Sequence, residues 1–329
     1  MEFIRFKTGK DDEGRRLDRI AKKLLSEENL SQLYKALRNG LIKVNEKKQK
    51  CEYRIQKGDE IKIASFLAEN AVLADKKNQE KITPLPEEWI VLRTQELLFL
   101  NKPYDLPVQK SKAGEQALNV LVQEDYDFFN SQNTRKSLSF RTGPLHRLDR
   151  RTTGLIAFSQ NLEGAQAFSK AIQEHRIKKT YLAIVEGALE QTETWTEKIS
   201  RNEKDLDSSK FHTVSVNSDS KNSKESNTTA IPLAYGKYKG IQVSLVKFII
   251  STGRTHQIRA TSAYHSHPLL GDTVYGARQI SEKQNLFLHS YSLEFQENLF
   301  SLPKKIVCPP GENFVSVLKS ALINLPCEL

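Results

Sequence analysis

A polar stretch that ends in two prolines, Thr83-Pro84-Leu85-Pro86, divides the chain into a short front part and a long remainder. This composition is typical of a linker, because proline interrupts regular structure and polar residues have little to bury. The 329 residues also exceed what one small hydrophobic core organises. The sequence therefore predicts a small domain at residues 1–67, a linker at residues 68–86 and a large domain at residues 87–329.

The composition, with 38% apolar and 27% charged residues, is that of a folded soluble protein. No uninterrupted apolar run approaches about 18 residues, the length needed to cross a bilayer, and the first residues do not resemble a signal peptide. Cys51, Cys308 and Cys327 lie far apart without C-x-x-C spacing, which favours ordinary thiols in a reducing compartment. We therefore expect a cytoplasmic monomer without membrane contact or a metal site.

The positive charge of the chain is concentrated in its front part. The net charge is +10, and residues 1–65 hold 17 Lys/Arg against 11 Asp/Glu, a surplus of six. Excess positive charge suits a polyanionic partner, because neutralising phosphates releases counterions. The front part is therefore the expected electrostatic contact with a nucleic acid, although many basic proteins bind none.

The front part has the periodicity of two helices and a few short strands. Apolar residues repeat with helical spacing from 17 to 24. Ser31 is the expected N-cap of a second helix that Gly40 ends. Strands are expected at 41–45 and 60–63. The basic side chains on these elements fit an RNA-binding surface, and a merely solvated basic face would have the same pattern.

The large domain alternates strand-like and helix-like segments, which indicates an α+β fold. One helix is marked by Ala165, Phe168 and Ile172 as its buried stripe. Residues 201–227 are polar and rich in Ser and Asn, and we expect them to form a long, partly mobile surface insertion. The expected strands are residues 89–92, 97–100, 154–159, 179–185 and 241–250.

A single carboxylate lies among arginines in residues 145–155, which read LHRLDRRTTGL. Guanidinium neighbours favour the charged form of Asp149 and fix its direction, as a nucleophile or a base requires. An ion pair that merely pins a loop is the alternative, and it is the more common role of an isolated Asp beside Arg. The arginines of this stretch are Arg147, Arg150 and Arg151.

Two further stretches combine functional side chains with tight backbone geometry. Residues 177–187 read IKKTYLAIVEG, and strand alternation places Tyr181 on the same face as Ala183. For an isolated tyrosine, a core position with the hydroxyl at an edge is the plainer interpretation. Residues 251–259 read STGRTHQIR, followed by HP at 267–268 and GDTVYG at 271–276.

These stretches closely resemble the signature blocks of the RluA family of pseudouridine synthases. The family blocks read H-R-L-D-x-x-T-S-G-L, K-x-Y-x-A-x-V-x-G, G-R-T-H-Q-[IL]-R and H-P-x-x-G-D-x-x-Y-G, and the chain has all four in order. Asn101-Lys102-Pro103 resembles a further family segment. The resemblance implies a mixed, mainly antiparallel sheet and an enzyme that isomerises uridine in structured RNA without a cofactor.

Residues 15–63 look like an S4 RNA-binding domain, which the family often carries in front of the synthase domain. The segment 34–63 looks closer to the RluC-type enzymes of large-subunit ribosomal RNA than to the RluD type. The S4-like domain and the strong basicity favour ribosomal RNA over transfer RNA as the partner. The residues expected to bind RNA in this domain are Arg16, Ser31, Lys35, Arg38 and Lys43.

The resemblance also assigns roles to residues of the large domain. Asp149 falls at the position of the essential aspartate, Tyr181 at that of the active-site tyrosine, and Arg259 at that of an arginine that pairs with the aspartate. Arg147 matches an arginine that occupies the gap left by a flipped base. In the third block, Arg254 and His256 are expected to contact RNA.

The implied reaction breaks the glycosidic bond of a uridine, rotates the base and rejoins it through carbon. The nucleotide must leave the stacked helix, which costs a few kcal/mol. Asp149 acts either as a nucleophile or as a base at the ribose, and both remain open. The alternatives are an assembly factor that retains an inactive synthase domain, and a hydrolase with paired carboxylates. The second needs another acid near Asp149, where the sequence has arginines.

Overall fold

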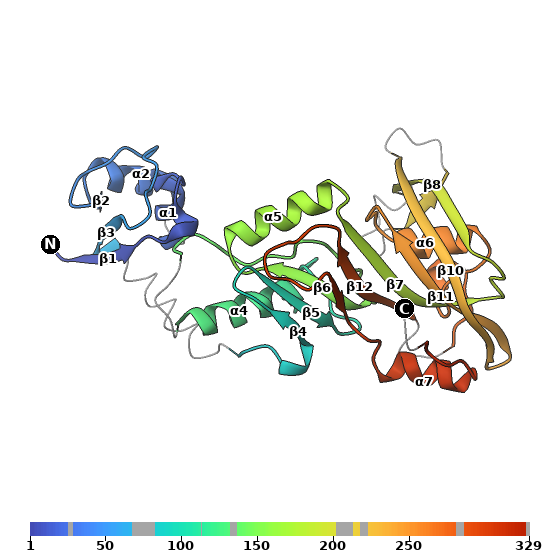
Figure 1. The fold of residues 1–329 in the computed structure, drawn as a ribbon. Coiled ribbons are helices and arrows are strands. Elements are labelled where there is room, and N and C mark those ends of the chain that lie inside the picture. Colours follow the sequence, from blue (N-terminus) through green and yellow to red (C-terminus); the bar gives the residue numbers. More distant parts are fainter. Residues whose placement is uncertain are drawn as a thin grey trace.

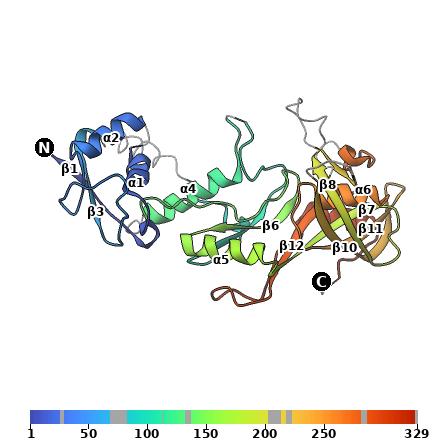
Figure 2. The ribbon, with the colours of Figure 1, turned by 90° about the horizontal axis from the view of Figure 1, so that it is seen from above.

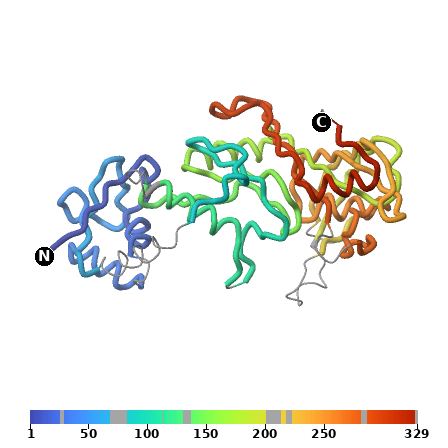
Figure 3. The backbone as a smooth tube through the Cα atoms, turned by 90° about the horizontal axis from the view of Figure 1, so that it is seen from below, coloured from blue at the N-terminus to red at the C-terminus, as the bar shows by residue number. Residues whose placement is uncertain are grey.

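The computed structural model describes residues 1–25, 29–67, 83–112, 114–131, 137–201, 213–217, 223–280 and 286–326. The molecule is elongated, with a small α/β unit at the N-terminal end and a large sheet in the remainder (Figure 1). Figures 2 and 3, viewed from opposite sides, show the same order from one end to the other. The predicted linker lies outside the described residues except for residues 83–86.

The N-terminal unit folds around its own apolar cluster. Leu17 and Ile20 on the first helix and Leu33 on the second pack with Ile61 of the closing strand. The two expected helices and both expected strands are present, and an additional first strand pairs antiparallel with the closing one. The elements are β1 (Phe3–Lys7), η1 (Lys10–Asp12), α1 (Leu17–Leu24), α2 (Leu30–Arg38), β2 (Ile42–Val44) and β3 (Glu60–Ala64), in the sheet order β1-β3-β2.

The predicted N-cap of α2 was wrong by two residues. Asn29 is the N-cap, and its side chain accepts a hydrogen bond from the backbone N–H of Gln32 at 3.0 Å. The Gln32 side chain in turn accepts from the backbone N–H of Asn29 at 3.4 Å. Only a residue three positions before a Glu or Gln can form this reciprocal pair. Ser31 therefore lies within the first turn of the helix and not before it.

The remainder of the chain is built on one sheet of ten strands among the described residues, in the order β4-β5-β6-β12-β7-β11-β10-β8-β9 with β13 beside β12. The pairs are antiparallel except β6–β12, which is parallel. The expected mixed, mainly antiparallel sheet is thus confirmed. The strands are β4 (Ile90–Arg93), β5 (Leu97–Lys102), β6 (Thr153–Ser159), β7 (Ile177–Glu186), β8 (Glu193–Arg201), β9 (Val214–Val216), β10 (Lys224–Tyr238), β11 (Ile241–Ile250), β12 (Leu288–Phe295) and β13 (Lys305–Val307).

Helices cover both faces of this sheet. On one face, the apolar cluster joins Val122 and Ile258 to strand residues that include Tyr181. On the other face, Phe168 and Phe314 pack in two further clusters. The helical elements are η2 (Glu87–Trp89), α4 (Leu118–Ser131), α5 (Leu162–Gln173), α6 (Gln257–Tyr264), η4 (Thr273–Tyr275) and α7 (Glu312–Ser320). Within the described part of the chain, no helix has the length and apolar character to cross a bilayer.

The predicted insertion at residues 201–227 was wrong in part, because two of its segments belong to the sheet. β9 pairs with β8, and the first residues of β10 continue the sheet on the other side of β8. Ser226 is fully buried there, and its hydroxyl donates to the Glu197 carbonyl at 3.0 Å. Short hydroxyl side chains can satisfy their polar atoms inside a sheet, so a polar composition did not reveal a strand. Residues 202–212 and 218–222 of this prediction lie outside the described residues.

The close approach of β6 and β12 brings the loop before β6 over the centre of the sheet. Gly154 at the start of β6 has φ +98°, and a Cβ there would collide with the Ser290 carbonyl oxygen and the His289 ring. Only glycine combines this backbone conformation with such a short separation between strands. The loop of residues 147–152 is therefore held directly beside β7 and β12.

Candidate active site

Four segments that are distant in sequence line one hollow in the surface of the large domain. They contribute residues 147–149 with Thr152, Tyr181 on β7, Ile250 with residues 253–259, and Leu288 on β12. We call this feature the Asp149 hollow. The sheet order β12-β7-β11 explains the convergence, because the central strands carry the loops toward the same place.

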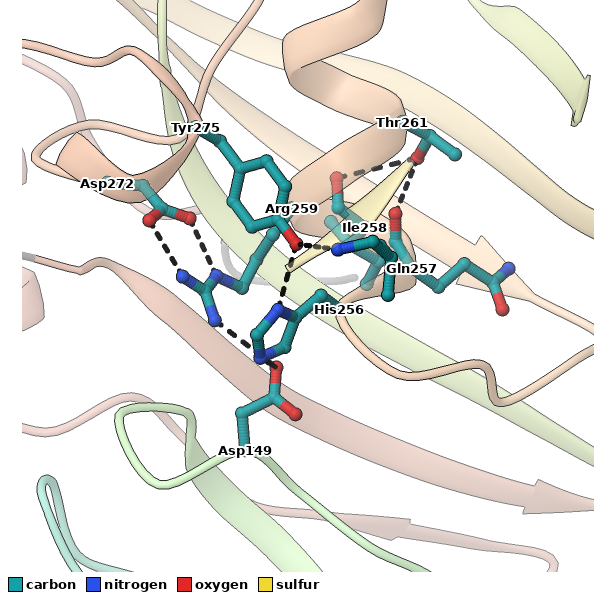
Figure 4. Close-up of polar contacts among 9 residues, drawn as sticks. Asp149, His256, Gln257, Ile258, Arg259, Thr261, Asp272 and Tyr275 are labelled. Carbon is teal, nitrogen blue, oxygen red and sulfur yellow. Dashed lines mark hydrogen bonds and ion pairs between the residues drawn. The ribbon is translucent and has the colours of Figure 1, made fainter. Parts of the chain in front are cut away.

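Asp149 faces two cationic or polar nitrogens from the third sequence block. Its Oδ2 lies 3.7 Å from Nη1 of Arg259 and 3.7 Å from Nε2 of His256, and its side chain is 16% exposed (Figure 4). Both contacts are longer than a hydrogen bond and within the range of an ion pair. The carboxylate is thus largely buried and still lines the hollow.

The arginines next to Asp149 in sequence are not its ion-pair partners in the structure. The guanidinium of Arg150 binds Asp105 at 2.8 Å and Glu115 at 2.9 Å. The expectation that neighbouring arginines surround the acid is therefore corrected. In a loop, successive side chains point in different directions, so the partner of Asp149 comes from α6 instead.

A second carboxylate, Asp272, fixes the direction of Arg259. Nε and Nη2 of Arg259 donate to the two oxygens of Asp272 at 2.6 and 2.8 Å. Both side chains are buried, with 8% and 3% exposure. The guanidinium also lies 5.1 Å from the ring centre of Tyr275. The bidentate pair leaves Nη1 as the nitrogen that points toward Asp149.

His256 has a left-handed backbone conformation, which is uncommon for residues other than glycine. It precedes α6 with φ +52° and ψ +21°, which is left-handed. This turn directs the ring between Asp149 and Tyr275, whose hydroxyl oxygen lies 2.9 Å from Nδ1 (Figure 4). Burial lowers the pKa of His256, and the charge of Asp149 opposes that shift.

Tyr181 is both a core residue and a residue of the candidate site, the two interpretations that its sequence position left open. Its ring is part of the apolar cluster and is only 6% exposed, yet it also lines the Asp149 hollow. Burial raises the pKa of Tyr181 well above its usual range, and a hydrogen bond with Ser290 opposes this shift. The hydroxyl is therefore held in its neutral form beside the carboxylate.

A buried lysine supports the loop that carries Asp149. The Lys102 side chain is fully buried, and its Nζ donates to the carbonyl oxygens of Pro103, Leu106 and Arg150 at 2.8–2.9 Å. Burial lowers the pKa of Lys102 to about 7, while Asp149 raises it. Three acceptors match the three hydrogens of an ammonium group. The sequence pattern at Asn101-Lys102-Pro103 did not indicate this role for the lysine.

Two arginines lie at the edge of the Asp149 hollow, as expected for residues that contact a polyanion. Arg147 and Arg254 both line the hollow and are exposed to solvent. The Nε of Arg254 donates to the Glu225 carbonyl at 3.1 Å. The large-domain residues predicted from sequence therefore meet at one place. Asp272 and Tyr275 were missed as individuals, although the fourth block contains both.

The predicted RNA-binding residues of the N-terminal unit are arranged more loosely. Ser31 and Arg38 line a second hollow, together with Lys48 and Lys50. Lys35 is exposed on the same helix, one turn from each. The two others have intramolecular contacts: Arg16 binds Asp18 at 2.7 Å, and Nζ of Lys43 lies 4.9 Å from the Phe3 ring centre.

Comparison with known proteins identifies the class of molecule to which this fold and site belong. The sequence model of the family described as RNA pseudouridylate synthase matches residues 96–264, about half of the chain. A solved human structure, RNA Pseudouridylate Synthase Domain Containing 1, has a TM-score of 0.54 and 25% identity over 71% of this chain and 89% of that chain. The fold is thus that of an RNA pseudouridine synthase, an isomerase.

Curated relatives extend this likeness over most of the chain. Ribosomal large subunit pseudouridine synthase C of Haemophilus influenzae is 30% identical over 294 residues, which cover 87% of this chain and 85% of the relative. The protein of the same name from Vibrio vulnificus is 27% identical over 94% of each chain. The chain therefore belongs to the RNA pseudouridylate synthase family, within its RluA branch and with RluC-like character. The resemblance found in the signature blocks is confirmed.

Proposed function

We propose that this protein isomerises specific uridines to pseudouridine in ribosomal RNA of the large subunit. The observation that carries the proposal is the meeting of Asp149, Tyr181 and Arg259 in one hollow, although they come from three separate segments. The relatives that bear the name of large-subunit ribosomal enzymes support the choice of RNA. The alternative of an inactive binding protein is disfavoured because all three side chains are present and adjacent.

We assign the chemistry at the ribose to the carboxylate of Asp149. Among the described residues it is the acid that lines the hollow, and a guanidinium and an imidazole both approach one of its oxygens. These contacts fix the orientation of the carboxylate, as either a nucleophile or a base requires. Tyr181 presents a flat, largely buried face on which a uracil ring can stack. Its hydroxyl is neutral and can donate a hydrogen bond to a nucleotide in the hollow.

We further propose that the target nucleotide is flipped out of its helix before reaction. A largely buried carboxylate cannot reach a ribose whose base remains stacked in a duplex. Arg147 lies exposed at the edge of the hollow, where its guanidinium can enter the vacancy left by the extruded base. Arg254 lies at the same edge and suits contact with the phosphate backbone.

We assign RNA binding outside the hollow to an S4-like N-terminal domain at residues 1–67. Exposed cations on α2 and in the loop after β2 support this role, since Arg38, Lys48 and Lys50 line a common hollow. Tyr34 lies among them with 38% exposure, which leaves a ring face for base stacking. The excess positive charge of residues 1–65 has the same sign as such a contact requires.

The deciding experiment maps pseudouridines in ribosomal RNA from cells that lack this protein. Restoring the wild-type chain should restore one or more modified positions, and restoring Asp149→Asn should restore none. The purified Asp149→Asn variant should keep its affinity for the RNA, because Lys and Arg side chains, and not a carboxylate, make the contacts with phosphates. Asp105→Asn, an exposed acid that pairs with Arg150, is the matched control and should behave as wild type. Measurable product from Asp149→Asn would remove the assignment.

A further inference from the structure

The hydroxyl of Tyr275 takes part in two hydrogen bonds at once. Its oxygen accepts from the backbone N–H of Val214 at 3.1 Å. The same oxygen lies 2.9 Å from Nδ1 of His256, and the two rings meet edge to face at 89° (Figure 4). These two partners together determine where the single hydroxyl hydrogen points.

The donor and acceptor roles follow from the chemistry of the groups. A backbone N–H only donates, so the Tyr275 oxygen is the acceptor in its bond with Val214. The hydroxyl hydrogen is then available for its other close partner, Nδ1 of His256. An Nδ1 that accepts carries no hydrogen, and the hydrogen of a neutral imidazole is then on Nε2. The contacts of Tyr275 thus favour one tautomer of His256.

The contact on the other side of the His256 ring, with Asp149, favours the same tautomer independently. Nε2 of His256 lies 3.7 Å from Oδ2 of Asp149. An N–H at Nε2 is attracted to a carboxylate oxygen, whereas the lone pair of the other tautomer would be repelled. Burial lowers the pKa of His256, Asp149 opposes this shift, and Arg259 adds to it. A neutral ring with Nε2–H satisfies both of its neighbours.

The two contacts of Asp149 fall on the same oxygen. Nε2 of His256 and Nη1 of Arg259 both approach Oδ2. Among the residues that the structure describes, Oδ1 has no hydrogen-bond or ion-pair partner. One oxygen is therefore held by the protein while the other stays available to a nucleotide in the hollow.

We propose that His256 is a positioning residue for Asp149, held as the Nε2–H tautomer by Tyr275 and the Val214 backbone so that it donates toward Oδ2. This inference rests on the proposed catalytic role of Asp149. It also gives a function to β9, which lies in the polar stretch of residues 201–227. Because Val214 belongs to β9, the placement of that strand bears on the geometry of the carboxylate.

The tautomer can be measured directly. In protein labelled with 15N at histidine, the ring nitrogens of His256 should show a protonated Nε2 and an unprotonated Nδ1 at neutral pH. Tyr275→Phe removes the hydroxyl and should shift the ring toward a mixture of tautomers. Asp149→Asn should change the Nε2–H signal. Tyr235→Phe removes an exposed hydroxyl that donates to the Glu190 carbonyl elsewhere on the sheet, and it should leave the His256 signals unchanged.

Turnover provides the second measurement. Tyr275→Phe should lower kcat about tenfold, the effect of losing one hydrogen bond in the transition state, with KM for the RNA nearly unchanged. The amide nitrogen of a glutamine can lie near the position of Nε2, so His256→Gln should keep more activity than His256→Leu. All three variants should keep the wild-type far-ultraviolet circular dichroism, and Tyr275→Phe should also keep the wild-type affinity for RNA.

Several outcomes would overturn the proposal. A wild-type His256 protonated on Nδ1, or on both nitrogens at neutral pH, contradicts the assigned tautomer. Equal loss in His256→Gln and His256→Leu, or wild-type kcat in Tyr275→Phe, contradicts the positioning role. If the wild-type chain itself forms no pseudouridine, the proposed function fails, and the nitrogen signals still decide whether Tyr275 fixes the tautomer.

Discussion

Asp272 holds Arg259 at two points, with Oδ2 accepting from Nε at 2.6 Å and Oδ1 accepting from Nη2 at 2.8 Å. Both side chains are buried, so water competes little for either group. A guanidinium gripped along one edge cannot rotate freely, and its remaining nitrogen has a fixed direction. The orientation of this arginine is therefore set by a residue 13 positions later in the chain.

Removing the charge of Asp272 should cost both stability and turnover. In Asp272→Asn, Arg259 keeps only the more distant Asp149 as an anionic partner, and breaking a buried ion pair costs about 3–5 kcal/mol. We expect the free energy of unfolding, measured by urea denaturation, to fall by that amount. Pseudouridine formation should fall as well, because Nη1 of Arg259 is no longer directed. The exposed pair of Arg150 and Asp105 is the control, and Asp105→Asn should leave the urea midpoint almost unchanged.

Asp12 should determine how firmly the N-terminal unit is attached to the large domain. Its carboxylate is fully buried and accepts from the backbone N–H groups of Leu138 and Ser139 at 2.9 Å. In Asp12→Ala these donors lose their acceptor, at a cost of about 1–3 kcal/mol each. We expect much faster amide hydrogen exchange at residues 138 and 139.

The neighbouring exposed ion pair provides the control for Asp12. Lys10 binds Glu163 at 2.7 Å with both side chains largely exposed. Lys10→Ala should therefore leave exchange at residues 138 and 139 close to wild type. Unchanged protection of both amides in Asp12→Ala would show that other contacts hold the two units together.

Gly154→Ala should destabilise the large domain. The added Cβ meets the Ser290 carbonyl oxygen on β12, and the residue would also have to adopt φ +98°. Overpacking of this kind costs about 1–3 kcal/mol, and left-handed backbone adds to it. The measurement is the thermal unfolding midpoint. Gly143→Ala is matched to it, because a Cβ at Gly143 has nothing within 4 Å, and its midpoint should stay at the wild-type value.

His146 should make the protein sensitive to acid. Its ring is stacked on Phe168, Nε2 accepts from the Ala157 N–H at 3.0 Å, and burial lowers the pKa of His146 to about 3. An unfolded histidine binds its proton near pH 6.5. Between about pH 6.5 and 3 the unfolded chain therefore binds the extra proton, and stability falls as the pH falls.

The size of this acid sensitivity can be tested by substitution. One such proton contributes a slope of about 1.4 kcal/mol per pH unit to the free energy of unfolding. His146→Gln keeps an acceptor for the Ala157 N–H without titrating, so its slope should be shallower by that amount. His289, whose pKa burial lowers to about 4, and His256, whose pKa burial also lowers, should contribute to the slope that remains. Identical slopes for the wild type and His146→Gln would contradict the prediction.

Much of the secondary structure followed from local pattern. The helical repeat from 17 to 24, the β-branched run that became β11 and the apolar stripe of α5 all lie within one element, where spacing alone decides which side chains face inward. β1, β8, β9, β10, β12 and β13 had no counterpart among the predicted strands. β1 and β9 are short, and each is defined by its pairing with another strand.

The candidate site was likewise predicted only in part from the sequence. Four ordered blocks determined which family the chain resembles and which side chains to examine, because residue types and local spacing are properties of the sequence itself. The sequence could not indicate that Arg150 turns away to Asp105, or that Asp272 directs Arg259 toward Asp149. These relationships depend on the directions of side chains brought together by sheet order β12-β7-β11. Only the tertiary structure decides them, since contacts between distant segments leave no periodicity in the chain.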